Sequence, residues 1–403
     1  MKKETIAVFL SFLLIPIGTS VRYADPSQTI DNSVLEPRLI AHTTSLFDKI
    51  YFRMLGCRVI HELNDATAIQ CPPGVVSRLQ NVEEEVYYHI LDMDANVQIG
   101  ADDVWESGYT GEGVTVAILD TGIDTDHPEL VSSIVGCVPM GLYESCEDDN
   151  GHGTHVAGII TADGIDEYAK GVTPNAEVWM AKVCNVAGVC CGSDIAAGIE
   201  HVVEENIAEI ISLSIGGGGT RRPNCNDNFL AQKVNWAVEN GVTVVVSAGN
   251  DPTVVSAPGC ASGAIAVGAV DKSDVRASFS GKGKALDIMA PGVNIYSTII
   301  DSYGSLNGTS MATPHVAATV ALIKQKNSEW SDSQIKEALY NTAVDLGLSS
   351  REQGHGKVDA YGAVTYSGTP EEPSQCKPRG VKCNCDGSCN FKETVESCPW
   401  DCS

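Results

Sequence analysis

Residues 94–366 alternate short apolar runs with longer helical patterns, and this alternation constrains the fold more than any other feature of the sequence. Runs such as Val114–Leu119 and Val242–Ala248 are mostly apolar without regular polar alternation, so strands formed there would be buried on both faces. We therefore predict an α/β domain with a doubly wound, mostly parallel sheet covered by helices on both sides. The other apolar runs are Glu177–Val183 and Ile207–Ile215, and helical patterns lie near 193–205, 229–239, 310–326 and 331–341.

Residues 1–20 predict a cleaved signal peptide. Lys2 and Lys3 precede the apolar run Ile6–Ile17, and small residues follow that run. A membrane anchor is the alternative, but the run is shorter than the roughly 20 residues that a spanning helix needs, and Pro16 interrupts it. We expect a secreted protein with no membrane attachment after cleavage, and the 15 cysteines fit an oxidising compartment.

Smaller regions flank the α/β domain. Residues 21–93 carry strand patterns at Lys49–Glu62 and Val82–Leu91 with a short helical pattern between them, which predicts a small α+β domain. Residues 367–375 have the composition of a linker. Residues 376–403 hold six cysteines and are too few to build a core, so we expect a module with three disulfides. A zinc site made by four cysteines is the alternative.

The charge balance excludes two classes of partner. The chain has 26 Lys and Arg against 52 Asp and Glu, which gives a net charge of −26. Nucleic acids and anionic membrane surfaces select clusters of basic residues, so neither is expected to bind this chain.

Four polar residues stand where this fold places functional side chains, at strand ends or helix starts. Taken singly, each has a plainer explanation: a turn acid, a structural histidine or one that binds metal together with His155, a turn amide, and an N-cap serine. The four are Asp120 in AILDTGID, His152 in GHGTHVAG, Asn250 in SAGN and Ser310 in GTSMATPHV.

Together these phrases, in this order, closely resemble the subtilisin-like serine protease family over about residues 109–364. The resemblance implies that Asp120 orients His152, that His152 takes the proton of the Ser310 hydroxyl, and that Ser310 attacks the scissile carbonyl. It also implies that the Asn250 amide and the Ser310 backbone N–H bind the oxyanion. This chemistry requires no cofactor.

The resemblance extends to substrate binding. The family binds the substrate backbone as an added strand along one phrase, and a second phrase forms a wall of the pocket for the residue before the cut bond. Neither phrase carries a charge here, so we predict a preference for a medium or large apolar side chain at that position. The residues are Ser214, Ile215 and Gly216 along the strand, and Ser247, Ala248 and Gly249 in the wall, with Ser256 and Ala257 near the pocket base.

Calcium is common in the family, and by resemblance three acidic residues are candidate ligands of a structural calcium ion. Glu129 stands where the family often has an aspartate, and Asp163 and Asp166 lie in a loop that matches the family's calcium loop in its distance from His152. Ile165 departs from the pattern, because a side-chain oxygen is expected there and calcium takes about six to eight oxygen ligands. A solvated acidic turn is the alternative.

Seven of the cysteines lie in the α/β domain, so one thiol is free or bridges to another domain. Our pairing hypotheses are Cys57–Cys71, Cys137–Cys146 and Cys225–Cys260.

The sequence therefore predicts a monomeric, secreted serine endopeptidase that acts on proteins or peptides. We expect it to be made as a zymogen, with residues 21–93 as a prodomain that templates folding, inhibits the enzyme and is removed by self-cleavage within about residues 88–101. Two alternatives are a narrow-specificity processing protease that docks through its tail and a catalytically idle homologue that acts as a binding protein.

Overall fold

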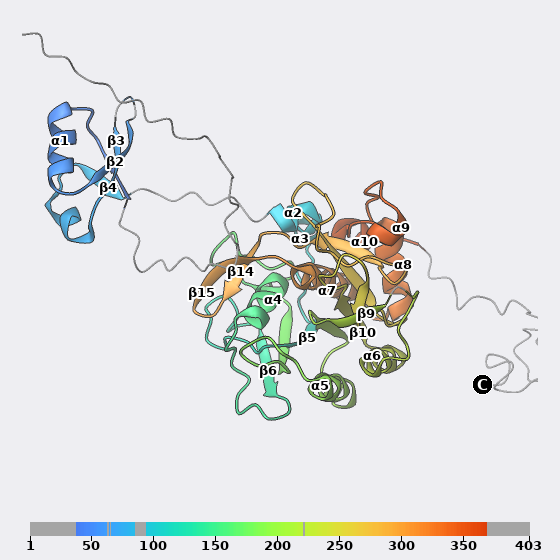
Figure 1. The fold of residues 1–403 in the computed structure, drawn as a ribbon. Coiled ribbons are helices and arrows are strands. Elements are labelled where there is room, and N and C mark those ends of the chain that lie inside the picture. Colours follow the sequence, from blue (N-terminus) through green and yellow to red (C-terminus); the bar gives the residue numbers. More distant parts are fainter. Residues whose placement is uncertain (1–37, 63, 65, 85–93, 221, 369–403) are drawn as a thin grey trace, which may run out of the picture. The chain divides into compact units, whose positions relative to one another are not determined.

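The computed structural model describes residues 38–62, 64, 66–84, 94–220 and 222–368 (Figure 1). It divides the chain into two compact units, residues 1–90 and 91–403, and each has its own buried core. The predicted signal peptide and cysteine-rich module lie outside the described residues. Within the described ranges, no helix has both the length and the apolar character needed to cross a bilayer.

The smaller unit is a four-stranded antiparallel sheet with the strand order β2-β3-β1-β4. Leu39, Phe52 and Ile69 are buried in its core beside the Cys57–Cys71 disulfide, a pairing that the sequence predicted. Its elements are β1 (Arg38–Ala41), α1 (Leu46–Met54), β2 (Arg58–Glu62), β3 (Thr67–Gln70), the 3₁₀ helix η2 (Pro73–Arg78) and β4 (Val82–Glu84).

The strand predicted at Lys49–Glu62 is wrong in its first half, where the chain forms α1 and only β2 is a strand. Tyr51 and Phe52 favour strands by propensity, but Phe52 packs into the core from a helix. Gly56 has a φ of +89°, and a glycine in this conformation commonly follows a helix C-terminus. That glycine is the local signal that separates the helix from the strand.

The larger unit is built on a seven-stranded sheet in which every neighbouring pair is parallel. This confirms the doubly wound α/β class. In order across the sheet, the strands are β13 (Ile288–Pro291), β12 (Ile265–Val270), β10 (Thr243–Ser247), β8 (Ile210–Leu213), β5 (Thr115–Asp120), β7 (Glu177–Lys182) and β6 (Ile134–Pro139).

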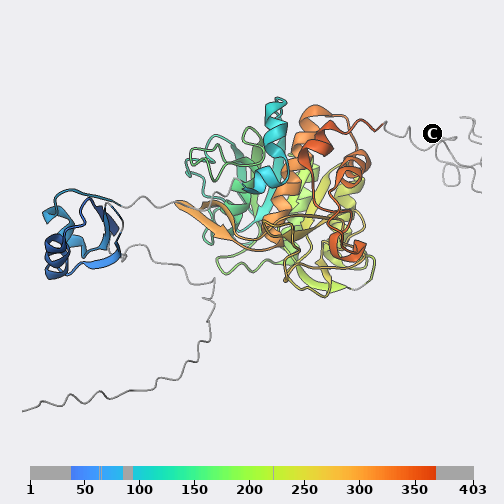
Figure 2. The same ribbon diagram turned by 90° about the horizontal axis from the view of Figure 1, so that it is seen from above.

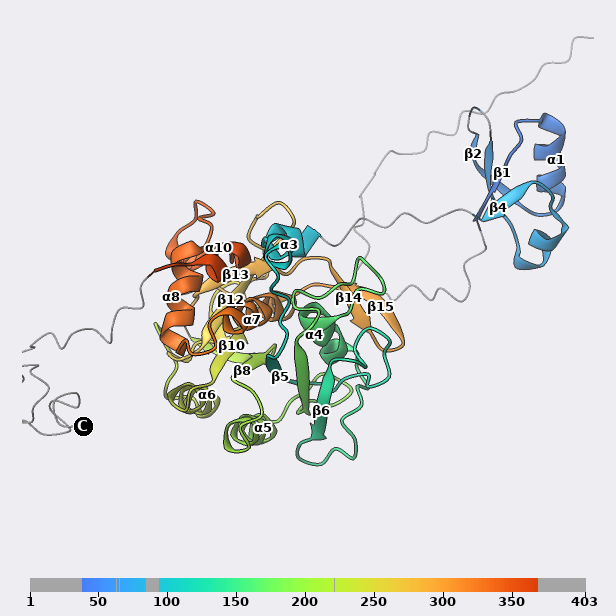
Figure 3. The same cartoon turned by 180° about the vertical axis from the view of Figure 1, so that it is seen from behind.

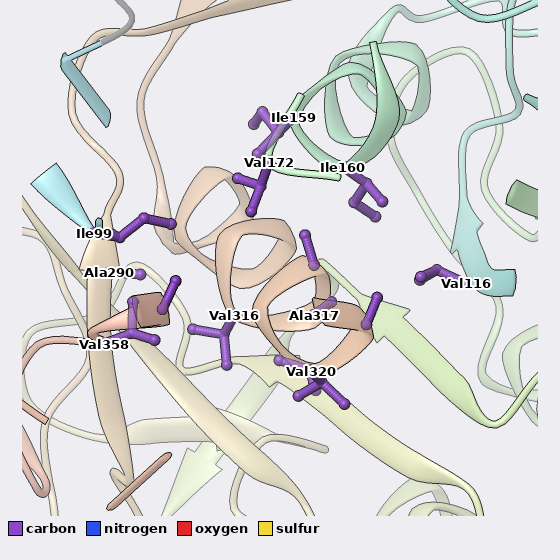
Figure 4. Close-up of a cluster of buried hydrophobic side chains, with 14 of the residues drawn as sticks. Ile99, Val116, Ile159, Ile160, Val172, Ala290, Val316, Ala317, Val320 and Val358 are labelled. Atoms are coloured by element: carbon purple, nitrogen blue, oxygen red, sulfur yellow. The ribbon is translucent and has the colours of Figure 1, made fainter. Parts of the chain in front are cut away.

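Helices cover both faces of this sheet, as Figures 2 and 3 show. Alternate residues of β5 point to opposite faces, so Val116 and Ile118 join the core under α4 (His152–Thr161) and α7 (Thr309–Lys326). Ala117 and Leu119 join the core under α5 (Gly192–Glu204) and α6 (Phe229–Glu239). Figure 4 shows the α7 side, where Val316 and Val320 pack among the buried side chains.

The remaining elements surround the sheet. The predicted Cys137–Cys146 and Cys225–Cys260 disulfides are present, a further bridge joins Cys184 to Cys190, and the exposed Cys191 has no bridge to any described residue. The elements are α2 (Asp94–Gln98), α3 (Ala101–Glu106), α8 (Asp332–Thr342), α9 (Ser350–Gln353), α10 (Ala360–Thr365), and two antiparallel pairs, β9 (Gly217–Thr220) with β11 (Val255–Ala257) and β14 (Ile295–Ile299) with β15 (Ser302–Leu306).

Candidate active site

The carboxyl ends of three central strands bring predicted residues to one edge of the sheet. Asp120 ends β5, Ser214 directly follows β8, and Ser247 ends β10. The first turns of α4 and α7 supply two more side chains. A single cleft of about 490 Å³ is lined by Asp120, His152, Ser214, Ser247, Asn250 and Ser310 together with other residues named below.

Asp120 and His152 are in direct contact. His152 Nδ1 donates to Asp120 Oδ1 at 2.7 Å, and the Thr121 N–H donates to the same oxygen at 2.7 Å. The Asp120 side chain is 1% exposed and the His152 side chain 28%. Burial alone would lower the pKa of His152, but the charge and hydrogen bond of Asp120 and the charge of Asp148 raise it above its ordinary value. The pair can therefore stabilise an imidazolium that forms during proton transfer.

The buried carboxylate of Asp148 holds the loop that leads into His152. It accepts the N–H groups of Asn150 and Gly151, both at 3.0 Å. It also accepts the N–H and hydroxyl of Thr154 at 2.9 and 2.7 Å. Burial would raise the pKa of Asp148, but these hydrogen bonds lower it below its ordinary value. Asp148 is therefore a fixed negative charge beside the imidazole.

Asp148 also reaches the segment that carries Asp120. The Thr121 hydroxyl donates to Asp148 Oδ1 at 2.9 Å and accepts the Gly153 N–H at 2.9 Å. Thr121 follows Asp120 and Gly153 follows His152, so one network orients both members of the pair. Sequence analysis did not select Asp148, because an acid within the phrase EDDN resembles a solvated turn.

The Asn250 side chain is oriented by Thr309. Asn250 Oδ1 accepts the Thr309 N–H at 3.0 Å and the Thr309 hydroxyl at 3.1 Å. These two hydrogen bonds fix the orientation of the amide, and the NH₂ group of Asn250 has no hydrogen-bond acceptor among the described residues. Because Thr309 immediately precedes Ser310, this free donor lies beside Ser310 and can bind a developing oxyanion.

Ser310 shares the cleft with His152 but is not hydrogen-bonded to it within the described structure. Ser310 Oγ donates instead to the Ser214 carbonyl at 3.2 Å. Catalytic hydrogen bonds often tighten only when substrate is bound, so rotation of this hydroxyl toward the imidazole is the movement that proton transfer requires.

Five of the six predicted substrate-binding residues line the cleft, and Ala248 does not, because its side chain is fully buried in the core. Gly249 has a φ of +88°, and a Cβ there would lie 2.1 Å from Ser256 Oγ, so the wall requires glycine. The pocket base residues Ser256 and Ala257 line the cleft as predicted. Lining residues that sequence reasoning missed include Thr121, Asn150, Cys184, Gly188, Cys190, Gly192, Ile195, Asn228, Leu230 and Pro258.

His155 does not form a metal pair with His152. Its Nε2 lies 2.9 Å from the Ile295 carbonyl, and burial lowers its pKa to about 3. The imidazole is therefore a neutral core group.

The predicted calcium loop does not fit a cation at Glu129. This fully buried carboxylate accepts the N–H groups of Gly164 and Ile165 on Oε2, at 2.7 and 3.0 Å. Its Oε1 accepts the Asp166 N–H at 2.6 Å and the Tyr303 hydroxyl at 2.9 Å. Backbone N–H groups that point inward form an anion-binding nest, whereas calcium requires inward oxygens.

The other two predicted calcium ligands, Asp163 and Asp166, accept hydrogen bonds from different groups. The Asp163 carboxylate accepts the Ser132 hydroxyl at 2.7 Å. The Asp166 carboxylate accepts the Tyr168 N–H and the Tyr296 hydroxyl, both at 3.0 Å. The set Glu129, Asp163 and Asp166 therefore does not converge on one point.

Asp124, Asp126 and Asp301 are a different acidic group, which sequence analysis did not select. One carboxylate oxygen from each lies within 4.8 Å of the others, and no other described group has three side chains suited to a metal. The hydrogen bond and charge of Asp124 raise the pKa of Asp126.

Comparison with known proteins identifies similar sequences. The model of the subtilase family matches residues 111–356, which lie within the parallel-sheet unit. The alkaline protease of Alkalihalobacillus alcalophilus is 47% identical over 260 residues, covering 64% of this chain and 66% of that relative. Subtilisin Savinase of Lederbergia lenta is also 47% identical over 260 residues, covering 64% of this chain and 93% of the relative. Subtilisin E of Bacillus subtilis (strain 168) is 40% identical over 274 residues, covering 66% and 70%.

Chelation with EDTA is expected to leave the melting temperature unchanged, whereas Glu129→Gln should lower it by roughly 6–12 °C. The amide donor of glutamine would face N–H groups, at an expected cost of at least about 3 kcal/mol in the free energy of unfolding. Asp163→Asn, at an exposed position of the same loop, should change stability by less than about 0.5 kcal/mol.

Asp126→Asn tests which of the two acidic regions binds an ion, when its melting temperature is measured by calorimetry with and without EDTA. An EDTA effect that disappears in Asp126→Asn would place an ion at the aspartate group and leave the Glu129 assignment intact. An EDTA effect that persists in Asp126→Asn and is lost in Glu129→Gln would contradict it.

Proposed function

The chain belongs to the subtilase family of serine endopeptidases, and on that premise we propose that it is a secreted enzyme that hydrolyses peptide bonds with Asp120, His152 and Ser310 as its catalytic triad. The observation that carries this proposal is the 2.7 Å contact between His152 Nδ1 and Asp120 Oδ1 in a cleft that also holds Ser310. Subtilases need no cofactor for catalysis.

In the proposed mechanism, substrate binding turns the Ser310 hydroxyl from the Ser214 carbonyl toward His152 Nε2. The imidazole takes the hydroxyl proton as Ser310 attacks the peptide carbonyl, and Asp120 offsets the positive charge that forms. The Asn250 amide and the Ser310 N–H hold the oxyanion. His152 then returns the proton to the leaving amine, and water hydrolyses the acyl-enzyme by the same steps in reverse.

We also propose that the smaller unit belongs to a prodomain, residues 21–93, that templates folding and inhibits the enzyme. This unit has its own core and precedes the parallel-sheet unit in the sequence, and both observations support this role. Parallel strand pairing forms slowly, so a template would benefit a sheet of this topology. The four disulfides of the described residues support an oxidising compartment, and we propose a monomer.

A narrow processing protease is the second candidate, and an idle homologue is the third. Two observations favour an active enzyme over an idle one: the hydrogen bond from Thr309 fixes the Asn250 amide, and His152 contacts Asp120. Breadth of specificity is a separate question: many cut sites in casein would favour a general endopeptidase, and one or two would favour a processing enzyme.

Ser310→Ala is expected to keep residues 21–93, whereas the wild type should lose the residues before about 88–101. Self-cleavage needs the hydroxyl, so intact mass in a protease-deficient host measures the difference. Ser328→Ala, at an exposed serine near the end of α7, should mature normally. Equal maturation of Ser310→Ala would show that another protease removes the segment.

Asp148→Asn is expected to shift the acid limb of the kcat/KM profile to lower pH. His152 must be neutral to accept a proton, and Asp148 raises the pKa of His152, so removing this charge lowers that pKa. Loss of loop orientation should also reduce the plateau roughly 10- to 100-fold. Glu144→Gln removes an equal charge from an exposed position of the same loop and should move neither quantity. An unshifted acid limb in Asp148→Asn would refute this role for its charge.

A peptide library should show medium or large apolar residues before the cut bond. A Cβ added at Gly216 would lie 3.1 Å from Ser256 Cβ, and both residues line the cleft, so the added methyl would narrow it. Gly216→Ala should therefore lower kcat/KM for phenylalanine by roughly 10-fold relative to alanine at that position. Gly283→Ala is the control, because Gly283 does not line the cleft and a Cβ there would make only an ordinary contact of 3.5 Å with Val255. A profile dominated by lysine or arginine would overturn the specificity proposal.

A further inference from the structure

Helix α7 contains a proline in its second turn. The helix begins at Thr309, and Pro314 lies inside it. In an α-helix each N–H donates to the carbonyl four residues earlier, and proline has no N–H. The carbonyl of Ser310 therefore lacks its helical donor, and the proline ring also crowds that carbonyl. The missing hydrogen bond falls on the residue whose hydroxyl is the proposed nucleophile.

Ser214 supplies a donor to this carbonyl. Ser214 Oγ donates to the Ser310 carbonyl at 2.8 Å, and Ser310 Oγ donates to the Ser214 carbonyl at 3.2 Å. Ser214 is 5% exposed and directly follows β8, a strand that packs against α7. The two serines thus form a reciprocal pair that connects the edge of the sheet to the first turn of the helix.

Resting on the proposed function, we propose that the Ser214 hydroxyl is a positioning group for the nucleophile, because it replaces the main-chain donor that Pro314 lacks. The carbonyl, the N–H and the side chain of Ser310 all depend on the torsions about one Cα. Fixing the carbonyl therefore fixes the direction of the attacking hydroxyl and of the N–H proposed to bind the oxyanion. Sequence analysis gave Ser214 a role through the substrate backbone; its hydroxyl has this separate role.

The reciprocal pair also fits the proposed catalytic cycle. Ser310 Oγ must leave the Ser214 carbonyl to reach His152, which frees that carbonyl for another donor. The bond from Ser214 Oγ to the Ser310 carbonyl involves neither reacting atom, so it can persist through the reaction. The hydroxyl of Ser214 therefore holds the nucleophile's main chain while its side chain moves.

Ser212 provides a matched control. It lies two residues earlier on β8, it is fully buried, and its Oγ has no hydrogen-bond partner among the described residues. Removing that hydroxyl deletes the same atom two residues earlier in the chain without breaking a hydrogen bond to α7.

The experiment measures kcat and KM on a peptide p-nitroanilide, normalised by active-site titration. Ser214→Ala should lower kcat roughly 10- to 100-fold with KM changed less than about threefold, because a misdirected nucleophile slows chemistry more than binding. Ser212→Ala should keep the wild-type kcat. Pro314→Ala should also keep it, since a carbonyl oxygen has two lone pairs and accepts both the new N–H and the Ser214 hydroxyl.

The decisive variant is the double substitution Ser214→Ala with Pro314→Ala. Its new main-chain N–H can donate to the Ser310 carbonyl, so kcat should recover at least about tenfold over Ser214→Ala alone. A normal kcat in Ser214→Ala would overturn the proposal, and so would a double variant that melts like the wild type yet shows no recovery.

Two further comparisons keep the result interpretable. If Pro314→Ala lowers the melting temperature by itself, Ser214→Thr replaces the double variant, since it keeps the hydroxyl; a kcat as low as that of Ser214→Ala would then refute the proposal. Ser310→Ala, which has no serine to titrate, is measured alongside at the same protein concentration. Wild-type activity no higher than that of Ser310→Ala would mean that the proposed function has failed, independently of Ser214.

Discussion

A carboxyl group that is buried away from water must be hydrogen-bonded by the protein, and three buried carboxyl groups hold the loops around the parallel sheet in place. Asp120, Asp148 and Glu129 are each at most 9% exposed. Glu129 takes main-chain donors from a loop that is distant in sequence. Asp148 takes its donors from the loop and first turn around His152, and Asp120 takes the Thr121 N–H and the His152 imidazole. The buried Asp148 carboxylate thus fixes the position of the His152 ring, because it accepts hydrogen bonds from the N–H groups of Gly151 and Thr154 on either side of that residue.

The other side of the cleft is organised without buried charge. There the first turn of α7 lacks one internal hydrogen bond, and a strand end completes it through Ser214. No helical N–H competes for the Ser310 carbonyl, so the Ser214 hydroxyl is its donor and gives the helix a directional bond to the edge of the sheet. The proline costs the helix one hydrogen bond, and the vacated carbonyl becomes an attachment point between two elements that must be held in fixed register.

The sheet, its flanking helices and the residues that meet in the cleft could be predicted, because strands buried on both faces leave a strong pattern and the phrases around Asp120, His152 and Ser310 are specific. Helix α1 could not be, since Tyr51 and Phe52 have strand propensity and burial of Phe52 is a tertiary fact. The Cys184–Cys190 bridge spans only six residues, but the adjacent Cys191 left the choice of partner open. Asp148 accepts donors that are mostly local, but its phrase EDDN holds three acids, and residue types do not say which of them is buried. Around Glu129, residue types alone do not say whether N–H or C=O groups turn inward, and that choice decides between a cation and an anion site.

Because Glu129 is part of the chain, the order of the loop that surrounds it does not depend on the concentration of a free ion. A bound ion, by contrast, dissociates when its concentration in solution is low. A carboxylate on the same polymer has an effective concentration set by chain connectivity alone. Closing residues 163–168 is therefore a unimolecular event, complete as soon as the fold forms.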